Sequence, residues 1–165
     1  MLGHVYEPPG KRLRPALTML ASNFHIHDES SIRRVEIMAI AVELLHIASL
    51  IHDDTVDASE IRRGKATISS LWGRNAAVLV GDYIFASSAT FVCDTGHVGV
   101  IRRFSETIME LSSGELQELS GTFKYEQTFE GYYERIYDKT ASLICTAAEA
   151  GGVLSDAPEG QTRAL

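Results

Sequence analysis

Three aspartates close the most apolar part of this sequence. Asp53, Asp54 and Asp57 follow the run Ile37–Ile51, in which almost every residue is apolar. In a helix, Asp53 and Asp57 lie on the same face, roughly 6 Å apart along the axis. Like charges at this spacing repel, and the C-terminal end of a helix is already the negative end of its dipole. The pair therefore predicts a nearby cation, and paired carboxylates suit a hard ion such as Mg²⁺.

Basic residues follow the aspartates within a few positions: Arg62, Arg63 and Lys65. A guanidinium fork matches the oxygens of a phosphate group, and Mg²⁺ bound by one or two carboxylates takes its other ligands from water or phosphate. Together these residues indicate a bound diphosphate. The alternative is a solvated network of ion pairs, which would be the better explanation of a DDxxD motif standing alone. The apolar run before the motif and the arginines after it favour the diphosphate site.

Two further basic segments are candidates for anion binding. Lys11 and Arg14 lie three positions apart in GKRLRP (10–15), so one helical turn puts both on the same side. Pro15 suits the first turn of a helix, where cations are unfavourable unless an anion is present. Lys139, in DKTA (138–141), is either a surface lysine whose stem covers apolar neighbours or a third phosphate contact.

The elements that must position these residues are all helical. We expect helices over 15–22, 31–57, 67–72, 76–92 with Asn75 as its cap, 100–123, and 129–150 with Thr128 as its cap and Gly151–Gly152 as its end. No strand pattern or repeat is present, which predicts an all-α fold. The run 37–51 is apolar on nearly every side, as in a helix buried in a bundle, and is too short and too broken by Glu43 and His46 for a membrane span.

Composition narrows the class of protein. The chain has 165 residues, enough for one domain with a core, and a net charge of −7 that argues against a nucleic-acid partner. Cys93 and Cys145 lie in apolar contexts, and we expect buried, reduced thiols. With no signal peptide or transmembrane segment recognised, a cytoplasmic location is expected. Residues 156–159 begin a new helix shortly before the last residue, so 1–165 is predicted to be a single, incomplete domain.

Five segments in order, GKRLRP (10–15), LLHIASLIHDDTVD (44–57), RRGK (62–65), GDYIFA (81–86) and DKTA (138–141), give the chain a resemblance to the trans-isoprenyl diphosphate synthases, the polyprenyl synthetase family. The resemblance covers nearly the whole chain. It implies a partial helical bundle of the isoprenoid synthase type around a deep cavity, and a homodimer. It also implies the condensation of isopentenyl diphosphate with an allylic prenyl diphosphate, assisted by Mg²⁺.

The resemblance also implies a role for each matching residue. Asp53 and Asp57 would hold Mg²⁺, with Asp54 in support. Isopentenyl diphosphate would be bound by four residues: Lys11, Arg14, His46 and Arg63. The allylic diphosphate would be contacted by three: Arg62, Lys139 and Thr140.

Product length is suggested by the residues before the aspartates. Short-chain members carry a bulky aromatic residue there, whereas Ala48 and Ser49 are small, as in the long-chain, octaprenyl-like branch. The family has a second aspartate-rich motif on a later helix. This sequence does not contain it, because Asp156 is the only aspartate after Asp138. We therefore expect this chain alone to be inactive. The alternative is a non-catalytic subunit that binds diphosphate or stabilises a heteromeric synthase. A terpene cyclase, a third possibility, is disfavoured by GKRLRP and RRG.

Overall fold

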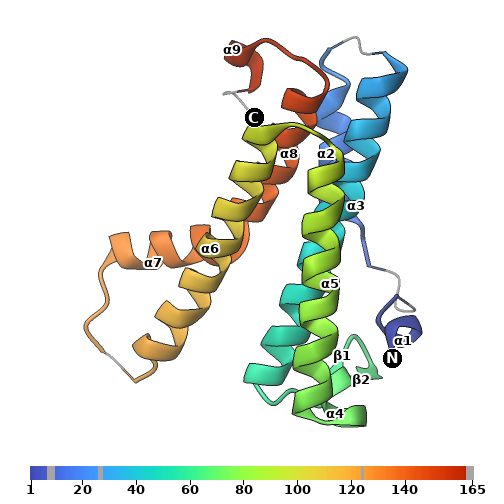
Figure 1. Cartoon of the computed structure of the whole chain (residues 1–165). Helices are drawn as coiled ribbons and strands as arrows, with labels where there is room; N and C mark the ends of the chain where they lie inside the picture. Colours follow the sequence, from blue (N-terminus) through green and yellow to red (C-terminus); the bar gives the residue numbers. More distant parts are fainter. Residues whose placement is uncertain (7–9, 26–27, 124, 163–165) are drawn as a thin grey trace.

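The computed structural model describes residues 1–6, 10–25, 28–123 and 125–162, and in these the predicted all-α fold is confirmed (Figure 1). Its helices are α1 (Leu2–Tyr6), α2 (Leu13–Ser22), α3 (Glu29–Val56), α4 (Ile68–Trp72), α5 (Arg74–Asp94), α6 (Val98–Gly121), α7 (Phe129–Ile136), the π-helix η1 (Tyr137–Ala141), α8 (Ser142–Leu154) and α9 (Glu159–Thr162). Two short strands, β1 (Ile61–Arg62) and β2 (Lys65–Ala66), lie between α3 and α4.

The central element is α3, which is buried on several faces as its apolar composition predicts. The Asp28 carboxylate accepts a hydrogen bond from the Ser31 backbone N–H at 2.8 Å and caps the helix, which therefore begins two residues before the predicted start. The helical turn continues to Asp57, whose N–H donates to the Asp53 carbonyl at 2.8 Å. Asp53 and Asp57 are thus one turn apart, as predicted.

Two hydrophobic clusters hold the bundle together. The larger joins α3 to α5, α6 and α8, and Met38, Leu45, Phe104 and Leu143 are among its members. The smaller joins α3 to α4 and α5 near the foot of the molecule. In Figure 1, α5 and α6 meet at the turn that connects them and then diverge, so α3 with α5 forms one arm and α6 with α7 the other. The aspartates lie at the lower end of the first arm.

The glycines at 151 and 152 do not end a helix, and that prediction is wrong. Both lie inside α8, which continues to Leu154. A Cβ atom on Gly151 would lie 2.2 Å from the backbone oxygen of Thr18, so the glycine permits close packing of α2 against α8. The sequence shows the glycine but not the helix that packs against it.

A β-hairpin lies in the segment that was predicted to be a loop. Ile61 pairs with Ala66 and Arg62 with Lys65, and the turn between them consists of Arg63 (φ 50°) and Gly64 (φ 78°). Two consecutive residues with positive φ are typical of a type I′ turn, whose twist matches that of the flanking strands. The hairpin therefore fixes the direction of both neighbouring arginines.

Other predictions need smaller corrections. Helix α5 begins at Arg74, with Gly73 rather than Asn75 at its N-cap. The single helix predicted over 129–150 is interrupted by η1, although Thr128 caps it as expected. Cys93 is exposed and Cys145 is half-buried, so neither is the fully buried thiol that was expected.

The helices α3 and α5 are both long and apolar enough to cross a membrane by length and composition. This is weak evidence, because the core helix of a soluble protein passes the same test. Here the two helices pack on one another and share both hydrophobic clusters.

The close approach at Gly151 leads to a prediction about stability. Gly151→Ala should lower the free energy of unfolding by about 1–3 kcal/mol, because the new methyl group overlaps backbone that cannot move aside. Alanine is the better helix former, so a loss cannot come from helix propensity. Urea unfolding followed by circular dichroism measures the change. Gly160→Ala, where a Cβ meets open space, is the matched control, and equal stabilities for the two variants would contradict the packing argument.

Candidate functional site

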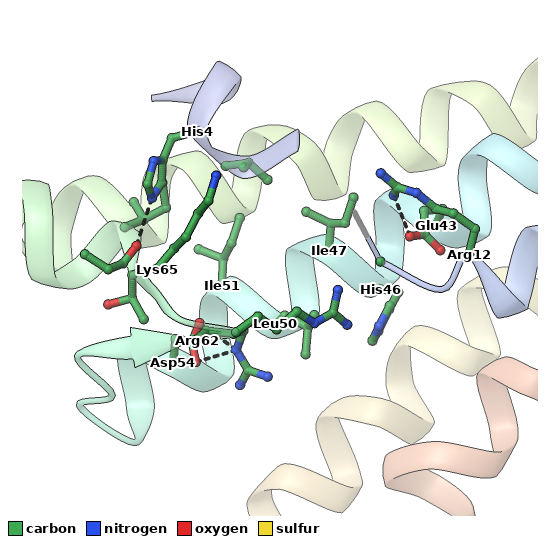
Figure 2. Close-up of a pocket in the computed structure, with 16 residues that line it drawn as sticks. His4, Arg12, Glu43, His46, Ile47, Leu50, Ile51, Asp54, Arg62 and Lys65 are labelled. Carbon is green, nitrogen blue, oxygen red and sulfur yellow. Dashed lines mark hydrogen bonds and ion pairs between the residues drawn. The ribbon is translucent and has the colours of Figure 1, made fainter. Parts of the chain in front are cut away.

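A pocket with basic walls lies beside α3, between that helix, the β-hairpin and the segment before α2 (Figure 2). Its charged and titratable lining residues are His4, Arg12, Glu43, His46, Asp54, Arg62, Arg63 and Lys65. Apolar side chains from α3, among them Ile47 and Leu50, form its floor. The structure therefore brings together arginine, lysine and histidine side chains from four segments of the chain, as a site for an anionic ligand requires.

His46 is the residue most affected by this environment. Burial, followed by the positive charges of Arg14, Arg63 and Arg62, lowers the pKa of His46 to about 4. The imidazole is therefore neutral near pH 7, so it offers an anion one hydrogen-bond donor and no charge. The positive charge of the pocket comes from its arginines and Lys65.

Among the described residues, two carboxylates line the pocket, and Glu43 is the one nearer the start of α3. Its side chain is 14% exposed and accepts a hydrogen bond from Nη1 of Arg12 at 2.6 Å. Burial lowers the pKa of Arg14, and the charge of Glu43 opposes this shift. Nε of Arg14 is buried and has no hydrogen-bond partner among the described residues. Glu43 thus stabilises two cations that would otherwise repel each other.

Asp54 and Arg62 form the second ion pair of the pocket. Nε of Arg62 donates to both carboxylate oxygens of Asp54, at 2.7 and 2.8 Å, and the Asp54 side chain is 9% exposed. Burial raises the pKa of Asp54, while the hydrogen bond and charge of Arg62 oppose the rise. This pair ties the hairpin to the end of α3, so Asp54 supports the site by holding an arginine.

Two residues that line the basic pocket have a strained backbone conformation. Arg12 and Arg63 both have φ near 50°, in the left-handed region that costs energy for residues other than glycine. A Cβ on Gly10 would lie 2.9 Å from Nη1 of Arg63, so the segment before α2 runs directly over this side chain. Strain of this kind persists only where the surroundings enforce it, and it concentrates at binding sites.

A second group of charges lies around Asp53. Asp53 is not among the described residues that line the basic pocket. Burial, then the charge of Glu115 on α6, raises the pKa of Asp53 to about 6, and Lys139 and Arg62 oppose the rise. Nζ of Lys139 lies 3.1 Å from Glu115 and also contacts Glu118. Two neighbouring elements, α6 and η1, therefore present charges to the end of α3.

The two outer aspartates have the chemistry of a Mg²⁺ site. Asp53 and Asp57 are one turn apart, and two carboxylates are what Mg²⁺ usually takes from a protein. Burial, followed by the charge of Glu115, disfavours the ionised form of Asp53 and raises its pKa, and a divalent cation would offset this cost. No group of three or more His, Cys, Asp or Glu side chains that could hold a metal ion is found in the described residues. A bound ion would therefore complete its shell with water or ligand oxygens.

The predicted site residues fall into two sets. His46, Asp54, Arg62 and Arg63 line the basic pocket, and Arg14 acts on it through its charge. Asp53, the exposed Asp57 and Lys139 surround the second group of charges, with exposed Thr140 on the same π-helix. Lys11 is exposed and is not among the described residues that line the pocket.

Sequence reasoning missed three members of the site. Arg12 and Glu43 line the pocket, and Glu115 pairs with Lys139. Lys65, which was predicted together with Arg62 and Arg63, also lines the pocket. Glu115 and Glu118 are three positions apart and so lie on the same side of one helical turn, as Asp53 and Asp57 do at a spacing of four, so a comparable signal was available.

One other expectation changes. Ala48 is fully buried in the smaller hydrophobic cluster, and the Ser49 hydroxyl donates to the His46 carbonyl at 2.9 Å, so Ala48 packs against other helices. Asp82, a charged residue on the neighbouring helix α5, is 60% exposed and lies 3.3 Å from His52.

Comparison with known proteins gives one consistent result. The whole chain, residues 1–165, matches the family model described as polyprenyl synthetase. A prenyl transferase of Synechocystis sp. is 40% identical over 155 residues, covering 94% of this chain and 48% of that protein. Component 2 of the heptaprenyl diphosphate synthase of Geobacillus stearothermophilus is 35% identical, covering 94% of this chain and 48% of that protein.

A solved structure agrees with these matches. The decaprenyl diphosphate synthase from Rhodobacter capsulatus superposes with a TM-score of 0.92 at 37% identity, covering 99% of this chain and 49% of that one. The chain thus spans about half the length of the curated relatives it matches.

The raised pKa of Asp53 predicts a pH-dependent gain in stability when its charge is removed. A carboxyl group whose pKa is raised from 3.8 to about 6 contributes stability that is present below 3.8 and lost as the pH rises through 6. Asp53→Asn, which stays neutral, should therefore be more stable than the natural chain near pH 7.5, by about 1 kcal/mol after allowance for solvent screening.

This gain should shrink as the pH falls through about 6 and vanish near 3.8. Urea unfolding of both proteins in buffer with a chelator gives the difference curve, in which the titrations of other groups cancel. A constant difference at all pH values would contradict a raised pKa for Asp53.

Proposed function

The chain belongs to the polyprenyl synthetase family, and we propose on this basis that it serves the condensation of isopentenyl diphosphate with an allylic prenyl diphosphate. The product is a trans-polyprenyl diphosphate, and the names of the heptaprenyl and decaprenyl relatives support a long one. The observation that carries the proposal is the division of charge at the end of α3. Asp54 faces a basic pocket, whereas Asp53 and Asp57 form a carboxylate pair outside that pocket that suits a cation.

The basic pocket is suited to isopentenyl diphosphate. Arg63 and the nearby Arg14 supply positive charge, and Lys11 stands at the start of the same basic segment. Neutral His46 donates one hydrogen bond without adding to the repulsion among the arginines. The apolar floor formed by α3 accommodates the hydrocarbon part of the substrate and keeps water away from it.

The second group of charges is suited to the allylic diphosphate. Asp53 and Asp57 would hold Mg²⁺, which when bound offsets the negative charge of the departing diphosphate. Lys139 and Thr140 lie on the facing element and contact the same group, and Arg62 adds charge while it holds Asp54. The carbon–oxygen bond to this diphosphate breaks, the double bond of isopentenyl diphosphate forms the new carbon–carbon bond, and a proton is lost.

The 165 residues carry one aspartate-rich motif, so we expect this chain alone to bind diphosphates without elongating them. The relatives described as component 2 of a heptaprenyl diphosphate synthase favour a second candidate function, that of a subunit in a heteromeric synthase. The gene sequence after codon 165 distinguishes the two. A second aspartate-rich motif supports the enzyme, and a stop codon supports the subunit. The homodimer and the cytoplasmic location are predictions that rest on the resemblance and on the sequence.

The metal assignment predicts the effect of removing one carboxylate. Asp53→Ala should weaken Mg²⁺-dependent binding of farnesyl diphosphate by at least about tenfold, because one of the two metal ligands is lost. Titration calorimetry with Mg²⁺ and with a chelator measures the effect, and circular dichroism checks that the helices remain.

Asp82→Ala is the matched control, since it removes an exposed carboxylate from the neighbouring helix α5. It should bind as the natural chain does. Undiminished Mg²⁺-dependent binding by Asp53→Ala, or an equal loss in both variants, would contradict the metal assignment.

A further inference from the structure

The residues expected to contact the allylic diphosphate lie on an unusual piece of backbone. Lys139 and Thr140 belong to the π-helix η1, a single turn inserted between α7 and α8. Such turns are rare, and they are found often at functional sites. Since a π-turn is less favourable than the α-helix around it, packing from a neighbouring element must stabilise it here.

The neighbouring element is α6, and the closest approach is at Gly114. A Cβ atom at this position would lie 2.9 Å from the backbone nitrogen of Lys139, 3.2 Å from its Cα and 3.1 Å from Cβ of Asp138. These are main-chain and first side-chain atoms, which cannot rotate away. Any residue other than glycine would therefore move η1 relative to α6.

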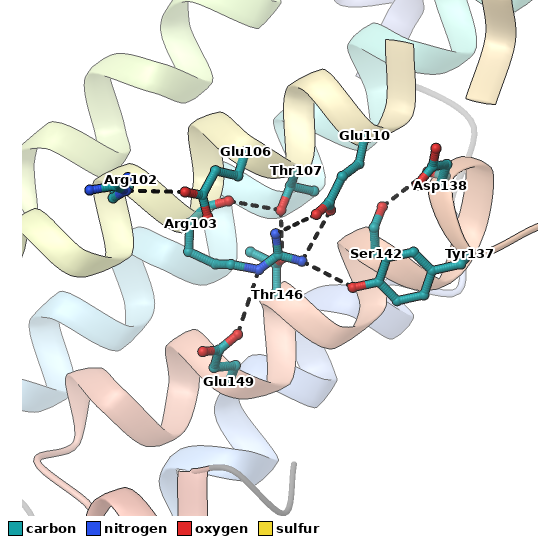
Figure 3. A network of polar contacts seen from close by, with 10 residues as sticks. All are labelled: Arg102, Arg103, Glu106, Thr107, Glu110, Tyr137, Asp138, Ser142, Thr146 and Glu149. Carbon is teal, nitrogen blue, oxygen red and sulfur yellow. Dashed lines mark hydrogen bonds and ion pairs between the residues drawn. The ribbon is translucent and has the colours of Figure 1, made fainter. Parts of the chain in front are cut away.

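The surrounding contacts prevent the two helices from separating to make room (Figure 3). Arg103 on α6 donates to both carboxylate oxygens of Glu110, at 2.8 and 3.1 Å, and to the Tyr137 hydroxyl at 3.4 Å. One turn further along, the hydroxyls of Thr107 and Thr146 share a buried hydrogen bond of 2.6 Å. These contacts hold α6 against the start of η1 and against α8.

The side chain of Lys139 shows what this close approach achieves. Its ammonium group lies between Glu115 and Glu118, the residues that follow Gly114 on α6. The charges of Glu115 and Lys139 both act on Asp53, the proposed metal ligand. The position of the η1 backbone therefore determines where the Lys139 charge lies relative to Asp53.

We propose that Gly114 is a positioning residue: it lets the η1 backbone pack directly against α6 and so fixes where Lys139 and its neighbour Thr140 lie to bind the diphosphate of the allylic substrate. The identity of the ligand in this proposal rests on the proposed function. The packing of η1 against α6 rests on the close approach of Gly114 to Asp138 and Lys139. Gly114 touches no substrate in this scheme and acts only through Lys139 and its neighbour.

Gly114→Ala tests the proposal, with Gly121→Ala as the matched control. Gly121 is the last residue of the same helix, and a Cβ on it meets only the far end of Arg135, at 3.9 Å. We expect Gly114→Ala to weaken Mg²⁺-dependent binding of farnesyl diphosphate by about 10- to 100-fold, as a shift of about 1 Å at a site can do. Gly121→Ala should stay within about twofold of the natural chain.

A double-mutant cycle separates positioning from a general effect on the fold. In the Lys139→Ala background, Gly114→Ala should cause little further loss, because both changes remove the same contact. Losses that multiply, or unchanged binding by Gly114→Ala alone, would overturn the proposal.

Amide hydrogen exchange over residues 137–142 tests the packing of η1 against α6 without any ligand. Gly114→Ala should speed exchange there, and Gly121→Ala should not. If the natural chain binds no diphosphate, the proposed function fails, and the positioning of η1 by Gly114 is then tested by hydrogen exchange alone. Unchanged exchange in Gly114→Ala would overturn this positioning role even where diphosphate binding is found.

Discussion

The constraint on which this structure depends is the cost of placing charge beside an apolar helix. α3 is buried over most of its length and ends in three aspartates, of which Asp53 is half-buried and Asp54 almost fully buried. Removing a carboxylate from water costs free energy unless a partner compensates it. Asp54 has Arg62 as its partner, and this pair explains why a hairpin follows the helix directly. Asp53 is compensated less completely, which is the physical basis for expecting a cation there.

The helices could be predicted from the sequence because their signals are local. Long apolar runs located α3 and α5, and caps such as Thr128 act within one turn. The errors occurred where a distant segment decides the local structure. Gly151 lies inside a helix because Thr18 packs against it, and η1 interrupts a helix because Gly114 lets its backbone approach α6. The hairpin was missed because its strands are only two residues long, too short for a period-two pattern.

The site shows the same division between local and distant information. Residue type and spacing identified the aspartates, Arg62 and Arg63, and the family resemblance added His46. The fold brings them together along the C-terminal half of α3. Glu43 and Glu115 were missed because their importance comes from partners 31 and 24 residues away, Arg12 and Lys139. A sequence lists possible ion-pair partners, but only the packing of α6 and of the segment before α2 selects among them.

The acidic partners also explain how so many cations can lie together without a bound anion. Glu43 holds Arg12, Asp54 holds Arg62, and Glu115 with Glu118 holds Lys139. Each carboxylate offsets the repulsion that its cation would otherwise feel from its neighbours. His46 reduces the same repulsion by remaining neutral, since burial and the arginines keep its pKa near 4. A diphosphate in this site would therefore compete with carboxylates already in place, which favours ligands that bring several oxygens and a metal ion over a single carboxylate.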